Sequence, residues 1–228
     1  VDDTADIEKA AKDIIDGCTF DNNLPCIAEK EVFVFDNVAD RLIAGMLRNG
    51  CIKLTREQAD ELAKVVVVEK TDSKTGKVTR SVNRDCVGRD CRVILKKIGI
   101  EVGPEIRCAI AEVPFEHTFV QTELMMPILG IVRVKDIDEA IDLAVKAEHG
   151  NRHTAHMHSK NIDNLSRFAK AIETTIFVKN APSYAGTGFG GEGHTTFTIA
   201  GPTGEGITSA KSYTRLRRCV MADHFRII

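Results

Sequence analysis

The amino-acid sequence predicts a protein of the α/β class with a largely parallel sheet. Segments of alternating or continuous apolar residues, which are typical of strands, alternate along the chain with segments of helical spacing. Parallel strands need a crossover connection between them, so this alternation favours parallel pairing. The chain has 228 residues, of which 43% are hydrophobic, and is therefore long enough to bury one sizeable core.

The first predicted elements are a helix, a strand and a second helix. The first helix is expected over residues 4–16, with acidic residues at its front where the helix dipole favours them, and Gly17 is expected to end it. Residues 31–36 alternate and then run apolar, as a buried strand does, and residues 38–50 return to helical spacing with Gly50 as the stop. The apolar positions of the first helix are Ile7, Ala10, Ala11, Ile14 and Ile15.

The alternation continues to residue 179. Thr55 and Gln58 form a capping box that begins the next helix, and the valine run 65–68 suits a strand. The remaining predicted elements are the segments 91–102 and 106–113, helix 137–148, strand 153–158, helix 161–172 and strand 174–179.

Two segments depart from this pattern. Residues 70–85 are polar and charged and are expected to form a loop. Residues 181–206 are rich in glycine and contain the spacing Gly-x-Gly-x-x-Gly, at Gly186, Gly188 and Gly191. A dinucleotide-binding fingerprint needs a helix directly after it, but residues rich in Thr and Phe follow here. We therefore interpret this segment as a loop that packs closely against backbone or substrate.

The composition argues against several classes of protein. A formal net charge of -2 does not suit a protein that neutralises phosphates, so we expect no nucleic-acid partner. No apolar run approaches the roughly 20 residues that a membrane span needs, and no signal segment opens the chain. The seven cysteines are odd in number and scattered, which favours reduced thiols in an intracellular, soluble protein.

A cluster of histidines raises the question of a metal site. Its members are His149, His153, His156 and His158. The first pair would share a face only on a helix, which a glycine and an asparagine interrupt, and the second pair would share a face only on a strand. No suitably spaced cysteine or carboxylate accompanies them, so we expect a polar surface or loop cluster and no metal.

Cys18 and Cys26 stand eight residues apart, ahead of the first predicted strand. Cys26 follows polar, turn-forming residues and therefore lies in a loop, a typical place for functional residues. Cys18 falls at the end of the first predicted helix and suits a structural role. A lone cysteine is more often structural than catalytic, so the residues alone leave both interpretations of Cys26 open.

Four segments carry long motifs that cover nearly the whole chain in order. They are FDNNLPCIAEKEV (20–32), FVQTELMMPILGIVRV (119–134), residues 148–183 and residues 188–220. Together they resemble the C-terminal, catalytic half of the CoA-acylating aldehyde dehydrogenases, particularly the propionaldehyde and acetaldehyde dehydrogenases of bacterial propanediol and ethanolamine utilisation. The resemblance implies a three-layer aldehyde-dehydrogenase-like catalytic domain over residues 1–206 and a C-terminal oligomerisation strand in a tail over residues 207–228.

The resemblance assigns roles to two residues. Cys26 takes the place of the nucleophilic cysteine, which forms a thioester from a short aldehyde with NAD and passes the acyl group to coenzyme A. Glu123 takes the place of the glutamate that binds the nicotinamide ribose, with Pro127 in register. Met125 and Met126 replace the Phe and Gly of the family motif, so the aromatic contact does not carry over.

The resemblance also implies partners and a location. A nucleotide-binding half precedes the point where Val1 stands and is missing here, so we expect no dehydrogenase turnover from this chain alone. The full-length protein is expected to form a dimer or tetramer in the cytoplasm, where members of this group are packaged inside bacterial microcompartments. Two other interpretations are a truncated paralogue that acts as an assembly or scaffold partner, and a cysteine hydrolase that uses His117, His153 or His194.

Overall fold

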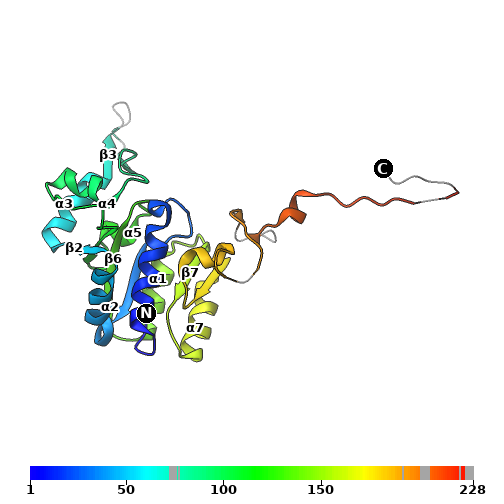
Figure 1. Cartoon of the computed structure of the whole chain (residues 1–228), viewed down its shortest axis with the longest axis horizontal. Coiled ribbons are helices and arrows are strands. Elements are labelled where there is room, and N and C mark those ends of the chain that lie inside the picture. Colours follow the sequence, from blue (N-terminus) through cyan, green and yellow to red (C-terminus); the bar gives the residue numbers. More distant parts are fainter. Residues whose placement is uncertain (72–75, 77, 192, 201–205, 221, 224–228) are drawn as a thin grey trace.

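The computed structural model describes residues 1–71, 76, 78–191, 193–200, 206–220 and 222–223. Its centre is a sheet of four parallel strands in the order β1, β6, β5, β2 (Figure 1). Their bounds are β1 Glu31–Phe35, β6 Ile128–Val134, β5 Cys108–Glu112 and β2 Cys51–Lys53. Nearly all residues of β5 and β6 are buried, because helices cover both faces. The predicted α/β class and parallel sheet are confirmed.

Two layers of helices enclose this sheet, which gives the predicted three-layer architecture. One layer consists of α1 (Ile7–Thr19) and α2 (Asp36–Arg48). The other consists of α3 (Arg56–Val66), α4 (Cys91–Leu95) and α6 (Ile137–Ala147). Neighbouring residues of one strand enter opposite cores, since side chains alternate along a strand. On β6, Ile131 packs in the core with α1 and α2, and Val132 packs in the core with α3 and α4.

A second, two-stranded parallel sheet lies beside the first. It consists of β7 (Thr154–Met157) and β8 (Ile176–Lys179), which α7 (Ile162–Ile172) connects. Helix α6 packs against α7, so the small sheet stays next to the β1 edge of the large one (Figure 1).

Helix α1 extends beyond its predicted end. Asp6 caps its start by accepting a hydrogen bond from the Lys9 N–H at 3.2 Å, and the helix continues to Thr19. The predicted stop at Gly17 is therefore wrong. A Cβ at Gly17 would lie 2.3 Å from both carboxylate oxygens of Glu29, so the glycine makes room for a tertiary contact inside the helix.

The capping box at the start of α3 is confirmed. The Thr55 side chain accepts from the Gln58 N–H, and Gln58 Oε1 accepts from the Thr55 N–H at 2.9 Å. The valine run 65–68 is divided between two elements, because Val66 ends α3 and Val67 begins β3. Val66 is fully buried in the core beneath α3, which holds it in the helix despite the strand preference of valine.

The predicted loop over residues 70–85 is wrong in part. Strands β3 (Val67–Thr71) and β4 (Val78–Val82) pair antiparallel as a hairpin that projects from the body of the protein (Figure 1). Arg80, one of the charges that favoured a loop, instead pairs across the hairpin, where its Nε stands 2.8 Å from Oε1 of Glu69. Segment 91–102 forms α4 and the 3₁₀ helix η2 (Lys96–Ile98).

Short elements complete the described chain after β8. They are the 3₁₀ helix η3 (Ser183–Thr187), the antiparallel strands β9 (Ile199–Ala200) and β10 (Gly206–Ile207), and the 3₁₀ helix η4 (Ala210–Tyr213). Residues 214–220 extend away from the body (Figure 1) and pair with no described strand. The oligomerisation strand and the domain division after residue 206 thus stay predictions.

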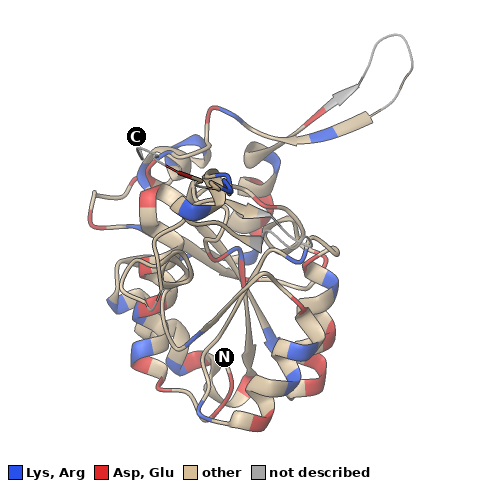
Figure 2. Ribbon diagram, turned by 90° about the vertical axis from the view of Figure 1, so that its right-hand side faces the viewer, with Lys and Arg blue, Asp and Glu red and all other residues tan. Residues whose placement is uncertain are grey.

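Charges of both signs are interspersed on the helices (Figure 2). The strands carry charges as well: the Arg133 guanidinium on β6 pairs with Asp36 of α2 at 3.1 Å and with Glu112 of β5 at 2.5 Å. Among the residues with described structure, no helix is both long and apolar enough to cross a membrane.

Candidate active site

The loop that carries Cys26 makes a tight turn between α1 and β1. Three successive residues adopt the left-handed backbone region, with φ values of 47° at Asp21, 51° at Asn22 and 67° at Asn23. Asn and Asp enter this region more readily than other side chains that have a Cβ. The predicted turn is thus confirmed, and it leaves Cys26 exposed in front of the sheet.

Asn23 fixes both ends of this loop. Its Nδ2 donates to the carbonyl of Cys18 in α1 at 2.9 Å and to the carbonyl of Glu29, just before β1, at 3.1 Å. Asn23 is buried, so water does not compete well for these bonds. Leaving such buried groups without partners costs about 1–3 kcal/mol, so the side chain holds Cys26 at a fixed place.

The seven cysteines fall into two groups. Five are buried: Cys18, Cys51, Cys86, Cys91 and Cys108. The Cys18 sulfur lies 3.8 Å from that of Cys108 within the core, which agrees with a structural role for Cys18. The two exposed thiols are Cys26 and Cys219. Cys26 lines a cavity, and Cys219 lies on the extended tail.

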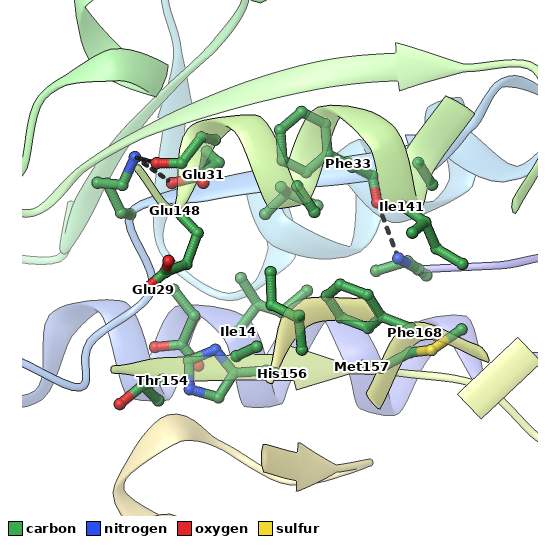
Figure 3. A pocket seen from close by; sticks show the side chains of 18 of the residues that line it. Ile14, Glu29, Glu31, Phe33, Ile141, Glu148, Thr154, His156, Met157 and Phe168 are labelled. Carbon is green, nitrogen blue, oxygen red and sulfur yellow. Dashed lines mark hydrogen bonds and ion pairs between the residues drawn. The ribbon is translucent and has the colours of Figure 1, made fainter. Parts of the chain in front are cut away.

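Cys26 and Glu123 line the same cavity, which has a volume of about 560 Å³. It lies between β1 and β7, with α1 on one side and α6 and α7 on the other (Figure 3). Apolar side chains such as Ile14, Ile141 and Phe168 form much of its wall (Figure 3). The structure therefore brings together the two site residues that the sequence predicts, 97 positions apart in the chain.

The thiol of Cys26 is not activated by its surroundings in this chain. Burial raises its pKa, and the negative charge of Glu123 raises that pKa further. Lys30, its nearest basic neighbour in sequence, is engaged elsewhere. The Lys30 ammonium donates to the carbonyl of Val120 and pairs with Glu31 at 3.0 Å. The Cys26 thiol is thus mainly protonated at neutral pH.

Glu123 stands at the turn between α5 (Thr118–Gln121) and β6. Its neighbours Leu124 and Met126 are buried, and Met125 takes a positive φ of 56° that turns the chain between them. Glu123 itself is exposed. Within the described residues its carboxylate forms neither an ion pair nor a hydrogen bond, so both oxygens can accept from ligand hydroxyls.

Glu29 is a site residue that the sequence analysis missed. It lies three residues after Cys26, is only 4% exposed, and lines the same cavity (Figure 3). Its Oε1 accepts from the Ser183 N–H at 3.0 Å, while its Oε2 has no partner among the described atoms. Burial raises the pKa of Glu29 from its ordinary value of 4.5 to about 8, so it is mainly protonated at neutral pH. The signal in the sequence that could have identified Glu29 is an acidic residue close to the start of an apolar strand.

Burial differs among the four clustered histidines, since His149 is exposed as predicted and His158 is buried. Burial lowers the pKa of His156 to about 4 and that of His158 to about 3, so both rings are neutral. The expected surface cluster is wrong for His158, which is 4% exposed and lies directly after β7. In the described part of the chain, no three His, Cys, Asp or Glu side chains are grouped to hold a metal ion.

The three histidines of the hydrolase interpretation have other contacts. His117 Nδ1 accepts from a backbone N–H at 3.1 Å and caps α5. His194 Nε2 lies 3.0 Å from a backbone carbonyl, and His153 Nδ1 lies 2.6 Å from a threonine hydroxyl. None of these contacts involves Cys26. His153 lines the same cavity as Cys26, but the described contacts include no hydrogen bond between the two side chains, which a Cys–His nucleophile needs.

Comparison with known proteins decides the family. A family model described as "Aldehyde dehydrogenase family" matches residues 1–218. This chain belongs to the aldehyde dehydrogenase family. It is 51% identical over 228 residues to the acetaldehyde dehydrogenase (acetylating) EutE of Salmonella typhimurium, covering 100% of this chain and 48% of that protein. It is 47% identical to the propanal dehydrogenase (CoA-propanoylating) of Citrobacter freundii, covering 100% of this chain and 47% of the relative.

Solved structures of aldehyde dehydrogenases show the same fold. A propionaldehyde dehydrogenase from the fucose utilisation bacterial microcompartment of Clostridium phytofermentans superimposes with a TM-score of 0.86 at 56% identity, over 96% of this chain and 48% of the other. The propionaldehyde dehydrogenase of Rhodopseudomonas palustris, with bound CoA and an acylated cysteine, has a TM-score of 0.86 at 52% identity and the same two coverages. The chain thus spans about half the length of these relatives.

Proposed function

We propose that this chain is the catalytic half of a CoA-acylating aldehyde dehydrogenase that converts propionaldehyde or acetaldehyde to the acyl-CoA. The observation that carries this proposal is the position of Cys26, an exposed thiol on a clamped loop that shares a cavity with Glu123. The similarity to acetylating and CoA-propanoylating dehydrogenases supports it. So does the acylated cysteine of the Rhodopseudomonas palustris relative.

Cysteine suits both halves of this reaction. The Cys26 thiolate adds to the aldehyde carbonyl, and after oxidation the acyl group is held on its sulfur as a thioester, from which the thiol of coenzyme A displaces it. The Cys26 backbone N–H is the donor that we assign to the developing oxyanion, a type of contact worth about 2.7–4 kcal/mol in other enzymes. The surroundings raise the thiol pKa, and the chain spans about half the length of its relatives, so we expect no turnover by this chain alone.

Glu123 suits the binding of a nicotinamide dinucleotide. Its exposed carboxylate has acceptor oxygens that are free among the described residues and that fit the two hydroxyls of a ribose. The bound nicotinamide supplies the hydride acceptor. An engineered glycolyl-CoA reductase that is 52% identical to this chain binds NADP⁺, which supports the cofactor class, and NAD is our choice within it.

The proposal extends to partners and location. A nucleotide-binding half completes the site, and the complete protein forms a homodimer or homotetramer through the tail 207–228. We place it in the cytoplasm, inside a bacterial microcompartment and in contact with its shell. The origin of the Clostridium phytofermentans relative in such a compartment supports this location.

The test is acyl transfer from propionyl-CoA, which runs the last step backwards and needs no nicotinamide cofactor. We expect intact mass and peptide mapping of the protein with its nucleotide-binding half to locate one propionyl group on Cys26. Cys26→Ala abolishes the adduct, and Cys219→Ala, which removes the other exposed thiol, leaves it unchanged. An unmodified Cys26 in the completed protein contradicts the proposal and favours the scaffold interpretation.

A further inference from the structure

We propose that Gly88 is a positioning residue that sets the distance between Cys26 and Glu123. Gly88 lies in the loop over residues 83–90, which we call the Gly88 loop. The proposal rests on the function proposed above, in which the thiol of Cys26 carries the acyl group and the carboxylate of Glu123 binds the nicotinamide ribose. Gly88 acts through the two loops that it joins and not by contact with the reacting atoms.

The first observation is that Gly88 is hydrogen-bonded to both loops of the candidate site. Its carbonyl accepts from Asn22 Nδ2 at 3.1 Å, and its N–H donates to the Met125 carbonyl at 3.0 Å. Asn22 stands four residues before Cys26 in the chain. Met125 stands two residues after Glu123. A single residue thus connects the segment of the proposed nucleophile to the segment of the proposed ribose ligand.

The second observation is that the position favours glycine for two reasons. Gly88 has a φ of 66°, in a backbone region that glycine enters without strain. A Cβ there would also lie 3.1 Å from three carbons of the Leu24 side chain, which belongs to the Cys26 loop. The absence of a side chain on Gly88 lets Leu24 pack closely against the Gly88 loop. Apolar contact therefore adds to the hydrogen bond on this side.

The third observation is that the Gly88 loop is itself anchored in the core. Asn83 Nδ2 donates to the Val65 carbonyl at 2.9 Å, and the Asn83 N–H donates to the Val66 carbonyl at 2.8 Å, both at the end of α3. Cys86, in the middle of the loop, is 0% exposed and packs in the core with α3 and α4. The Gly88 loop is thus a firm support on which two other loops are held.

The fourth observation is the backbone of Met125. Its φ of 56° lies in the left-handed region, which costs free energy for a residue with a Cβ. Such conformations persist where the surrounding structure holds them. The hydrogen bond from the Gly88 N–H to the Met125 carbonyl is a contact of this kind. The direction of the turn that presents Glu123 therefore depends on Gly88.

The distance between Cys26 and Glu123 matters for one step of the proposed reaction. In the oxidation, the carbon bound to the Cys26 sulfur gives a hydride to the nicotinamide and its hydroxyl gives a proton to solvent, which leaves the thioester. This step needs the sulfur and the cofactor at a fixed separation, and a misplacement of about 1 Å can cost roughly 100-fold in rate. Acyl exchange with coenzyme A uses the sulfur but not Glu123. Loss of the Gly88 contacts should therefore separate the two half-reactions.

The first test measures both half-reactions in the protein with its nucleotide-binding half. Gly88→Ala pushes Leu24 away, and Asn22→Ala removes the side-chain donor without introducing backbone strain. We expect each variant to slow NADH formation from propionaldehyde by about tenfold or more. Transfer of the propionyl group from propionyl-CoA to Cys26 should keep its wild-type rate in both.

Two matched control variants should keep the wild-type rate of both half-reactions. Gly99→Ala changes a glycine with a φ of 76° that has no neighbour within 4 Å of the new Cβ, so it introduces backbone strain without a new contact. Asn49→Ala removes a side-chain bond to the Gly45 carbonyl, at the end of α2.

The second test measures the separation without any cofactor. The negative charge of Glu123 raises the pKa of the Cys26 thiol, so Glu123→Gln lowers that pKa. In the Gly88→Ala and Asn22→Ala backgrounds we expect this lowering to be roughly halved or less, because charge interactions weaken with distance. Alkylation of Cys26 by iodoacetamide from pH 7 to 10, followed by mass spectrometry, gives the thiol pKa of each protein.

The results that contradict the proposal are distinct. Unchanged NADH formation in both Gly88→Ala and Asn22→Ala overturns it, and so does a Glu123 effect on the thiol pKa that remains complete in these backgrounds. Loss of acyl transfer together with NADH formation means that Gly88 supports the fold in general, which also overturns it. If Cys26 of the wild type accepts no propionyl group, the proposed function fails, while the alkylation test still decides whether Gly88 sets the distance.

Discussion

The backbone N–H of Ser183 donates a hydrogen bond to Glu29 Oε1 at 3.0 Å, across 154 positions of sequence. This bond joins the loop of Cys26 to the start of the glycine-rich segment. Because Glu29 is buried and mainly protonated at neutral pH, the Ser183 N–H donates to a neutral acid there. The stability of the fold and the placement of the proposed nucleophile are therefore linked to one titrating group.

Glu29→Gln should alter the pH dependence of stability. The pKa of Glu29 is about 8 in the folded chain against an ordinary 4.5, so the folded state holds the proton more tightly. Its stabilising contribution is complete below about pH 4.5 and is lost as the pH rises through 8, at no more than about 1.4 kcal/mol per pH unit. Because the buried His156 and His158 titrate in the opposite sense in both proteins, the comparison is the difference between them: in urea unfolding from pH 5 to 8, the free energy of unfolding of the wild type should fall relative to that of the Gln variant. If the free energies of unfolding of the two proteins change with pH in parallel, the raised pKa assigned to Glu29 is wrong.

Gly17→Ala should destabilise the protein although alanine favours helices. Alanine in place of glycine inside a helix normally gains about 1 kcal/mol. Here the new Cβ would meet the Glu29 carboxylate at 2.3 Å, so we expect a net loss of about 1–3 kcal/mol. Adding Glu29→Ala removes the clash. A double-mutant cycle by urea unfolding should therefore give a coupling energy that offsets the loss of stability caused by Gly17→Ala. If Gly17→Ala alone stabilises the protein, the predicted clash with Glu29 does not occur.

Asn23→Ala should loosen the Cys26 loop. It removes both bonds that Asn23 donates, to the carbonyls of Cys18 and Glu29, and should lower the free energy of unfolding by about 1–3 kcal/mol. Amide exchange in residues 24–30 should accelerate as well. Asn22→Ala is the matched control, since the Asn22 side chain bonds outside the loop, to the carbonyl of Gly88 at 3.1 Å. Equal loosening by both variants means that Asn23 is not the clamp.

Glu123→Gln should make the Cys26 thiol more acidic. Burial raises the thiol pKa first and the Glu123 charge raises it further, so removing that charge lowers the pKa without restoring it fully. The rate of Cys26 alkylation by iodoacetamide, followed by mass spectrometry from pH 7 to 10, should rise at lower pH in the variant. Glu116→Gln, at an exposed carboxylate outside the cavity, should match the wild type. If the wild type, Glu123→Gln and Glu116→Gln show the same pH dependence of alkylation, Glu123 lies too far from the Cys26 sulfur to raise its pKa.

Local sequence patterns predicted the elements whose structure depends on local causes. The capping box at Thr55 and the apolar run of β1 formed as expected, because hydrogen bonds and side-chain alternation within a few residues determine them. Gly17 was misjudged because its neighbour is Glu29, which reaches it through the fold. The hairpin of β3 and β4 was missed because its charged residues pair across strands, which composition does not show.

The candidate site divides in the same way. The motifs around Cys26 and Glu123 pointed to two residues, and the fold places both on one cavity, while their roles stay predictions. Glu29 escaped notice because its burial and its bond to Ser183 arise only when β1 and η3 meet. A pattern of residue types along the chain carries no record of such a contact.

The separation of the cysteines into five buried and two exposed thiols gives this protein an internal gauge of folding. A thiol-reactive chromophore should titrate two groups in the native chain and seven after denaturation, since none of the cysteines forms a disulfide. The buried five lie in the cores on both faces of the sheet, so partial counts would tell which core has opened. Cys18, Cys51 and Cys108 report on the layer of α1 and α2, while Cys86 and Cys91 report on the layer of α3 and α4.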